Sequence, residues 1–207
     1  MDHPTVAIPT LCRFDLLAGC VASAAGAVRI IVVDNSGGQC PPIPGAEVVP
    51  GRQPQSVAAA WNDAVRLVGG DVILANDDVV FAEDTIPALV SAAAAFPSAG
   101  IVSALEDERF ALFYLRHAAY VAVGAFDESF APAYFEDNDY AWRLRCAGWG
   151  LALAPSAVRH GGSRTIAAYD PERMQQHHRS FRANEARYRA KWGGGPGRER
   201  WRTPYGR

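Results

Sequence analysis

The sequence lacks the features that mark membrane-spanning, secreted and zinc-binding proteins. It has no uninterrupted apolar run of about eighteen residues or more, which a transmembrane helix would need. Its first residues, Met1 to Pro4, lack the positive-then-apolar order of a secretory signal. None of its four cysteines forms a CxxC pair, so we expect structural thiols rather than a zinc site or a disulfide framework. These absences predict a soluble, cytoplasmic protein without an integral membrane segment.

Sequence motifs of three common enzyme classes are absent as well. No GxGxxG follows the first apolar segment, residues 6–9, so the loop that would approach a dinucleotide pyrophosphate is missing, which argues against a dehydrogenase. No GxxxxGK[ST] is present, which argues against a P-loop ATPase. The lack of a GxSxG elbow leaves a nucleophilic serine triad without support.

The chain has enough apolar sequence for one core. It is 207 residues long, 49% hydrophobic and 20% charged, which predicts a single globular domain. We place that domain at residues 1–192, followed by a Gly/Arg-rich tail at residues 193–207 that we expect to be extended. The net charge is −2, yet residues 159–207 hold 12 Lys and Arg against 4 Asp and Glu. Such a segment can approach phosphates, although a solvated helix face is the commoner explanation.

Strand-like and helix-like segments alternate along the chain. The continuous apolar run of residues 28–33 predicts a strand buried on both faces, and the spacing of Val57, Trp61 and Val65 predicts a helix. This βαβ rhythm predicts an α/β fold with a mostly parallel central sheet flanked by helices. The expected strands are residues 6–9, 28–33, 48–49, 71–75, 101–104 and 110–115, and the expected helices are residues 11–24, 55–68, 83–95, 136–147 and 171–192.

Three polar residues, Asn76, Asp77 and Asp78, follow directly on the apolar run of residues 71–75. Ligands of open parallel sheets bind at the carboxyl ends of the strands, and paired carboxylates there suit a hard divalent cation that holds a diphosphate. The alternative is a polar turn at the end of a strand, with no ligand. The triplet alone leaves both interpretations open.

A second acidic stretch, residues 126–140, combines aromatic residues with carboxylates and leads directly into a helix. For Asp139 and Glu128, stabilisation of the helix N-terminus is the simpler explanation. Glu136 and Asp137 lie among aromatic side chains that can form a wall for a sugar, and a carboxylate in such a pocket is suited to act as a general base on a hydroxyl. These aromatic neighbours are Tyr134, Phe135 and Trp142.

Taken together, the segments resemble an inverting GT-A glycosyltransferase of family 2, and in particular its short soluble bacterial or phage members. The resemblance extends from Val6 to about Trp192, and the order and spacing of the pieces are more specific than any one of them. It implies a Rossmann-like GT-A domain. The segments that carry it are Val6-Ala7-Ile8-Pro9-Thr10 with Arg13, Val32-Val33-Asp34-Asn35, Trp61-Asn62, Asn76-Asp77-Asp78, residues 126–140 with Arg143, and His160.

The resemblance implies where a nucleotide-sugar donor binds. Asp34 and Asn35 would contact the base of the nucleotide. Asn76 stands at the first position of the DxD motif, where the family normally has aspartate, and Asp77 lies between the two motif positions. Asp78, at the last position, would coordinate Mn²⁺ or Mg²⁺ together with the donor diphosphate. The further residues implied are Pro9, Thr10, Arg13 and Asn62 in the nucleotide pocket, His160 as a second metal ligand, and Ser163 and Arg164 near the diphosphate.

The acceptor side is implied in the same way. Asp137 would be the catalytic base, and Glu136 would hydrogen-bond the acceptor, with Tyr134, Phe135 and Trp142 lining the site. A single base suffices when the acceptor hydroxyl attacks from the face opposite the leaving group, and the cation acts as a Lewis acid on that group.

The predicted activity is therefore metal-dependent transfer of a sugar, with inversion, from a UDP- or dTDP-linked donor to the hydroxyl of a protein, nucleic acid or glycan. Two alternatives stay open. A catalytically silent module would bind the nucleotide sugar without turnover, and a sugar-nucleotide nucleotidyltransferase would make the donor. The second alternative usually has a Gly- and Lys/Arg-rich phosphate loop near the first strand, which this chain lacks. The expected location is the bacterial cytoplasm, or the host cytoplasm for a phage protein, and the oligomeric state is left open.

Overall fold

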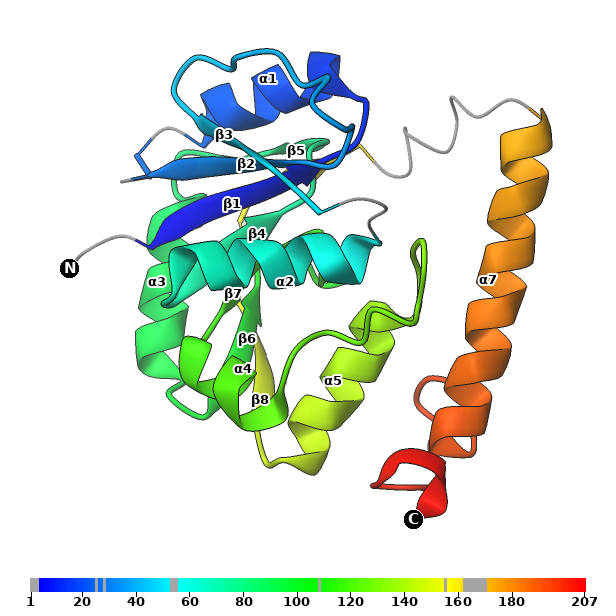
Figure 1. Ribbon diagram of the computed structural model, residues 1–207. Helices are drawn as coiled ribbons and strands as arrows, with labels where there is room; N and C mark the ends of the chain where they lie inside the picture. Colours follow the sequence, from blue (N-terminus) through cyan, green and yellow to red (C-terminus); the bar gives the residue numbers. More distant parts are fainter. Residues whose placement is uncertain are drawn as a thin grey trace.

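The computed structural model describes residues 4–24, 26–27, 29–52, 56–107, 109–154, 156–161 and 171–207. A seven-stranded sheet in the order β3-β2-β1-β4-β7-β6-β8 lies at its centre (Figure 1). Strand β7 is antiparallel to both of its neighbours, and every other adjacent pair in this sheet is parallel. The mostly parallel α/β fold predicted from the sequence is therefore confirmed. The strands are β1 Thr5–Thr10, β2 Ile30–Asp34, β3 Glu47–Pro50, β4 Val72–Ala75, β6 Ala99–Ser103, β7 Leu112–Leu115 and β8 Gly150–Leu153.

Helices cover both faces of the sheet, because its central strands bury side chains in both directions. In β1, Val6 and Ile8 join the apolar cluster beneath one pair of helices, and Ala7 joins the cluster on the opposite face. This alternation follows from the two-residue period of a strand. Helices α1 Phe14–Ser23 and α3 Thr85–Ala95 pack on the first face, and α2 Val57–Val68, α4 His117–Val123 and α5 Glu136–Cys146 pack on the second.

Strand β1 marks the point where the chain reverses its direction of winding. The chain moves from β1 outward to β2 and β3, and then crosses back to place β4 on the other side of β1. In doubly wound sheets, ligands bind outside the carboxyl ends of the strands at this reversal. The polar residues that end β1, β2 and β4 therefore lie where a ligand is expected.

A long helix, α7 Pro171–Trp192, lies to one side of the sheet and its covering helices (Figure 1). Its C-terminal half packs through Tyr188 and Trp192 against Phe130 and Phe135, the aromatic residues that precede α5. No helix in the described part of the chain has both the length and the apolar character needed to cross a membrane. All four cysteines lie within the described ranges and are free thiols.

The prediction of an extended tail was wrong. The backbone N–H groups of Arg200 and Trp201 both donate to the carbonyl of Trp192, at 3.0 and 3.2 Å. The indole of Trp142 donates to the carbonyl of Trp201 at 3.0 Å. The tail turns back over the end of α7 and the side of α5, where it covers the buried Trp192. It ends in a short 3-10 helix, Pro204–Gly206.

Candidate active site

Residues at the ends of β1 and β4 meet directly. The hydroxyl of Thr10 donates to the Oδ2 atom of Asp77 at 2.8 Å. Burial raises the pKa of Asp77 to about 6, and the neighbouring charge of Asp78 adds to this effect, whereas the Thr10 hydrogen bond opposes it. The acidic triplet therefore follows the carboxyl end of a strand, as predicted, and the strand order places it at the reversal point of the sheet.

A second, two-stranded sheet brings His160 to Asp78. Strand β5 Val79–Val80 pairs antiparallel with β9 Arg159–His160, and the N–H of Gly161 donates to the Asp78 carbonyl at 3.0 Å. As a result, the His160 Nε2 atom lies 3.0 Å from Asp78 Oδ1, with the two side chains only 11% and 7% exposed. An open pocket of about 200 Å³ adjoins the pair, lined by Leu16, Val80 and Arg159 among others.

This donor set fits a divalent cation that is completed by a substrate. A carboxylate and an imidazole supply two ligands, and Mg²⁺ or Mn²⁺ sites in phosphate-binding enzymes commonly take one or two protein carboxylates plus substrate phosphates and water. Among the described residues, no group of three or more His, Cys, Asp and Glu side chains is placed to hold a metal ion. The described residues thus offer a partial shell, with Asp78 and His160 as its expected members.

The end of β2 shapes a loop and leaves one polar atom available. Both carboxylate oxygens of Asp34 accept backbone N–H groups, from Ser36 at 2.8 Å, Gly38 at 3.0 Å and Cys40 at 3.4 Å. Burial raises the Asp34 pKa, but these bonds and the Ser36 hydroxyl outweigh it, so the pKa lies below its usual value. The side-chain Oδ1 of Asn35 is buried and has no hydrogen-bond partner among the described residues. Asp34 therefore holds the loop, and the Oδ1 of Asn35 is an acceptor without a partner among the described residues.

Other predicted donor-site residues occupy the same edge. Pro9 lies in β1 opposite Val33 of β2. Arg13 precedes α1, and its Nη2 lies 2.8 Å from Asp15 Oδ2. Asn76 donates its backbone N–H to the carbonyl of Ala111 at 2.8 Å, which joins the end of β4 to the start of β7. Ser163 and Arg164 lie outside the described residues.

The amide of Asn62, predicted to lie in the nucleotide pocket, is bonded within the chain around Phe126. Its side chain is fully buried, and its Nδ2 donates at 2.9 Å both to the Phe126 carbonyl and to Glu128 Oε1. Its Oδ1 accepts from the Phe126 N–H at 2.9 Å and from the Tyr120 hydroxyl at 3.2 Å. Because both polar atoms of the amide are bonded within the protein, Asn62 fixes the course of the chain at Phe126.

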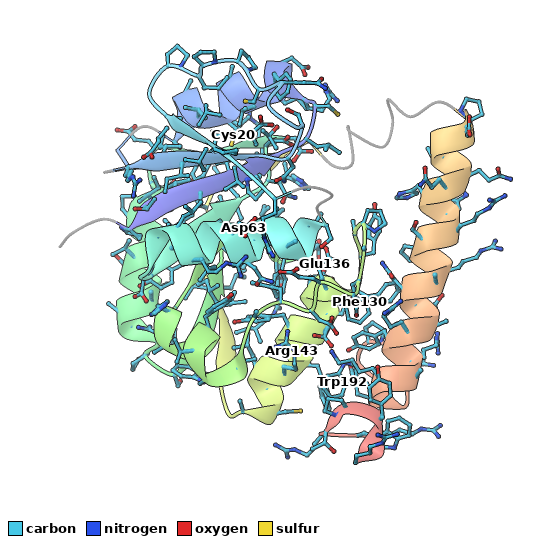
Figure 2. All side chains as sticks on the ribbon, viewed as in Figure 1. Cys20, Asp63, Phe130, Glu136, Arg143 and Trp192 are labelled. Atoms are coloured by element: carbon cyan, nitrogen blue, oxygen red, sulfur yellow. The ribbon has the colours of Figure 1, made fainter. Side chains whose placement is uncertain are left out.

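Glu136 and Asp137 occupy the first turn of α5, as predicted. Figure 2 shows Glu136 at the N-terminal end of that helix, beside α2. The two residues before them, Tyr134 and Phe135, have left-handed backbone conformations with φ of 78° and 73°. The Val57 N–H, in the first turn of α2, donates to the Pro132 carbonyl at 2.9 Å. The turn before α5 therefore lies at the N-terminal end of α2, which comes after β3 in the chain.

The two carboxyl groups differ in their surroundings. Glu136 is 5% exposed, and its Oε2 has no hydrogen-bond partner among the described residues. Burial, together with the charge of Asp137, raises the pKa of Glu136 to about 8. Asp137 is half-buried, and burial raises its pKa too, but its Oδ1 accepts the Asn138 N–H at 2.8 Å, which favours the ionised form. Glu136 is therefore mostly protonated at pH 7, whereas the Asp137 carboxyl has a backbone N–H donor that Glu136 Oε2 lacks among the described residues.

Comparison with known proteins identifies the family at this point. Residues 5–117 match the model described as glycosyl transferase family 2. This chain belongs to that family. The matched residues include Thr10, Asp34 and the acidic triplet, so the donor edge of this family 2 chain lies inside the match, whereas Glu136, Asp137 and His160 lie beyond it.

Solved structures share the GT-A fold with the family 2 chain. The mannosyltransferase PcManGT of Pyrobaculum calidifontis, in complex with GDP-Man and Mn²⁺, aligns with a TM-score of 0.61 at 18% identity, over 74% of this chain and 55% of that one. The catalytic domain of Drosophila β1,4-galactosyltransferase 7, complexed with xylobiose, aligns with a TM-score of 0.57 at 15% identity, over 81% and 74%. Residues 1–349 of S. aureus TarS align with a TM-score of 0.57 at 10% identity, over 74% and 58%.

One curated relative matches a short stretch of sequence. A protein of Leishmania donovani named galactofuranosyl glycosyltransferase is 42% identical over 50 residues, which are 24% of this chain and 12% of that protein. The family 2 chain thus corresponds to a small part of this relative and to 55% of the PcManGT chain.

The three aromatic residues predicted to line the acceptor site differ in exposure: Phe135 is buried, whereas Tyr134 and Trp142 are partly exposed. Phe135 is 8% exposed and packs on Tyr188 and Phe181 of α7, with ring centroids 5.8 and 5.2 Å apart. Trp142 faces the tail through its bond to Trp201. Both side chains therefore help to fix α7 and the tail, and their predicted part in the acceptor site stays a prediction. Tyr134 is half-buried and stays at the edge of the site, with its ring 5.3 Å from that of Phe181.

Sequence reasoning missed the residues of α7 that hold the acceptor side together. The buried Lys191, the only lysine of the chain, places its Nζ 2.7 Å from Asp127 Oδ2 and 2.6 Å from Asp139 Oδ1. Asp139 also accepts the Trp192 indole N–H at 2.9 Å and the Arg143 Nε–H at 2.8 Å. Asp139 lies in the first turn of α5, as expected, and it also belongs to a buried ion-pair network that was not predicted from the sequence. In the sequence, these buried polar residues were indicated only by their helical spacing on the side of α7 that also carries its aromatic residues.

Proposed function

We propose that this family 2 chain transfers a sugar from a nucleoside-diphosphate donor to an acceptor hydroxyl, with inversion at the anomeric carbon. The observation that carries the proposal is the pairing of Asp78 with His160 beside Asp77 and Thr10 at the reversal point of the sheet. That set fits a cation-bound diphosphate. GDP-Man and Mn²⁺ in the PcManGT structure support a nucleotide sugar and a divalent cation as the ligands.

On the donor side, each residue has a defined task. Asp78 and His160 would hold Mn²⁺ or Mg²⁺, which when bound supplies Lewis-acid stabilisation of the departing nucleoside diphosphate. The Oδ1 of Asn35, which has no partner among the residues that the structure describes, would accept from the base, in the loop that Asp34 fixes. Asp77, held by Thr10, adds negative charge next to the Asp78 carboxylate.

On the acceptor side, Asp137 accepts the proton of the attacking hydroxyl. The bond from the acceptor oxygen to the anomeric carbon forms as the bond to the phosphate oxygen breaks, the electron pair leaves with the diphosphate, and the proton goes to Asp137. Glu136, neutral at pH 7, donates a hydrogen bond to the acceptor oxygen or to a neighbouring hydroxyl. A positioned base of this kind typically contributes about 10²- to 10⁴-fold to the rate.

The test is calorimetric titration of UDP, dTDP, GDP and CDP with and without Mn²⁺ into wild type and Asp78→Ala. We expect one diphosphate to bind in the presence of Mn²⁺, with binding weakened about 10-fold or more in Asp78→Ala because a ligand of the cation is lost. Asp84→Ala, a carboxylate beyond the end of β5 that accepts from Ser156, is the matched control and should bind as wild type does.

Turnover separates this proposal from a silent binding module. A nucleotide sugar with the same base as the diphosphate that binds wild type is then incubated with the protein and Mn²⁺, and the release of that diphosphate is measured. Release above the rate without protein supports a transferase, with water as the acceptor. Tight binding without any release would favour the silent module, and the absence of binding by all four nucleotides would refute the donor site.

A further inference from the structure

The turn that precedes Glu136 is held by hydrogen bonds to four consecutive carbonyl groups. The side-chain Nδ2 of Asn184, on α7, lies 3.2 Å from the carbonyl oxygen of Ala131, 2.9 Å from that of Ala133 and 3.3 Å from that of Tyr134. The remaining carbonyl, that of Pro132, accepts the first N–H of α2 at 2.9 Å. One amide group from a distant helix thus serves three of the four acceptors.

This turn needs such support because its backbone is strained. Tyr134 and Phe135 both have positive φ, a region that costs free energy for bulky side chains. Such a conformation persists only where the surrounding structure over-determines it. Phe135 is also the residue immediately before α5, so its backbone angles set the direction in which the first turn of that helix projects Glu136 and Asp137.

Asn184 is built for this contact. It is 2% exposed and faces inward from α7 between Phe181 and Tyr188, which pack on Phe135. An amide donor in an apolar surrounding is stable only when it is bonded, and the described hydrogen bonds of its Nδ2 all go to this turn. The contact lies outside residues 5–117, which match the family model.

We infer that Asn184 is a positioning residue for sugar transfer: it holds the strained turn at Tyr134 and Phe135 in the conformation that aims Glu136 and Asp137 at the acceptor. The inference rests on the proposed function. It assigns α7, a helix remote from the donor edge, a role in the chemistry of the acceptor side. Loss of the amide lets the turn relax and moves the two carboxyl groups, while the donor edge stays intact.

The experiment compares wild type with Asn184→Ala, Asn184→Gln and Arg187→Gln in the full chain. Asn184→Gln keeps a carboxamide donor, and Arg187→Gln alters an exposed position of the same helix. Each protein is given the nucleotide sugar whose diphosphate binds wild type, with Mn²⁺ and with water as the acceptor. The kcat and KM for diphosphate release, the Kd of the diphosphate with Mn²⁺, and amide exchange of residues 134–137 are measured.

We expect Asn184→Ala to lower kcat about 10- to 100-fold, because small displacements of a catalytic group have effects of this size. Its KM and diphosphate Kd should stay within about twofold of wild type, and exchange at residues 134–137 should be faster. Asn184→Gln should recover part of kcat, and Arg187→Gln should match wild type. A merely structural role would lower kcat and diphosphate binding together, in proportion to the folded fraction.

An Asn184→Ala protein with unchanged kcat, or with diphosphate binding lost in step with kcat, would overturn the inference. The wild-type protein reports separately on the proposed function, since its own binding and turnover decide that question. If wild type bound the diphosphate but released none from the sugar donor, the proposed transfer would fail. Unaltered amide exchange at residues 134–137 in Asn184→Ala would then overturn the positioning contact as well.

Discussion

At the scale of single residues, adjacent carboxyl groups divide two tasks because their surroundings differ. Glu136 has a buried oxygen that finds no partner in the described part of the chain, and Asp137 accepts an N–H from its own helix. Two like charges this close cannot both ionise easily, so one proton stays on the more buried group. The neutral Glu136 can donate a hydrogen bond, and we assign the proton-accepting role to Asp137, whose carboxyl accepts the Asn138 N–H.

This division predicts unequal effects of two isosteric substitutions. Asp137→Asn should lower sugar transfer about 10²- to 10⁴-fold, the usual contribution of a general base, with diphosphate binding unchanged. Glu136→Gln keeps a neutral donor at its position and should lose no more than about 10-fold. Steady-state release of diphosphate, with calorimetric binding as the control, measures both. Near-normal transfer by Asp137→Asn would show that Asp137 is not the base.

The same pair predicts how stability depends on pH. The pKa of Glu136 is raised from the ordinary 4.5 to about 8 in the folded chain, so between these values the folded state binds the extra proton. The stabilisation that this proton contributes is therefore complete below about pH 4.5 and is lost as the pH rises toward 8. The unfolding free energy of Glu136→Gln minus that of wild type should therefore rise by about 3 kcal/mol from pH 5 to pH 8, because only wild type loses this contribution. Urea unfolding at the two pH values measures this gain, and an equal difference at both would contradict the buried neutral acid.

At the scale of elements, α7 is joined to α5 by buried charges. Lys191 bridges Asp127, before α5, and Asp139, in its first turn. Burial raises the pKa of Asp127, but the bonds from Lys191 and Ser129 outweigh it, so the pKa lies below its ordinary value. The contact of Asn184 with the turn depends on this anchor, because α7 reaches the body of the protein mainly through its C-terminal half (Figure 2).

Removal of the lysine should therefore destabilise the protein strongly. Lys191→Met leaves Asp139 buried with its charge partly uncompensated, which typically costs about 3–5 kcal/mol. Arg189→Gln is the matched control on the same helix: its partner Glu185 is exposed and such pairs contribute less than about 1 kcal/mol. Chemical unfolding of both variants tests this. A loss in Lys191→Met as small as in the control would show that α7 is held by its aromatic contacts alone.

At the scale of the whole molecule, the tail is part of the folded unit. A Cβ atom at Gly194 would lie 1.9 Å from the carbonyl oxygen of Arg198, a backbone atom that cannot move alone. A Cβ at Gly195 would lie 3.4 Å from the guanidinium carbon of Arg189, which is the far end of a flexible side chain. The tail therefore depends on the lack of a side chain at the first of these glycines.

This difference predicts which substitution opens the tail. Gly194→Ala should displace the tail from Trp192, and brief trypsin digestion should then cut at Arg198, Arg200 or Arg202 at least about fivefold faster than in wild type, since proteolysis follows local opening. Gly195→Ala should be cut at nearly the wild-type rate. Equal cleavage of both variants would show that the return of the tail does not depend on the close approach at Gly194.

Sequence patterns alone were enough to predict the fold class and the polar ends of the central strands. The apolar runs and helical spacings are local, so the expected strands and helices agree with those found to within a few residues. The short β5 and β9, the β8 strand and helix α4 were not foreseen, because segments of this length carry too little periodicity to be recognised. The reversed direction of β7 was likewise invisible, since an apolar strand shows the same pattern in either direction.

Only the tertiary structure decided which distant groups meet. The sequence indicated Asp78 and His160 as separate candidates, and the pairing of β5 with β9 brought them within 3.0 Å. It suggested Asn62 as a ligand contact, whereas folding used its amide to fix the chain at Phe126. It gave no sign that Asn184 supports the turn before Glu136. The preference of a segment for helix or strand depends on residues close to it in the sequence. These contacts join residues far apart in the sequence, so they form only when whole helices and strands pack together.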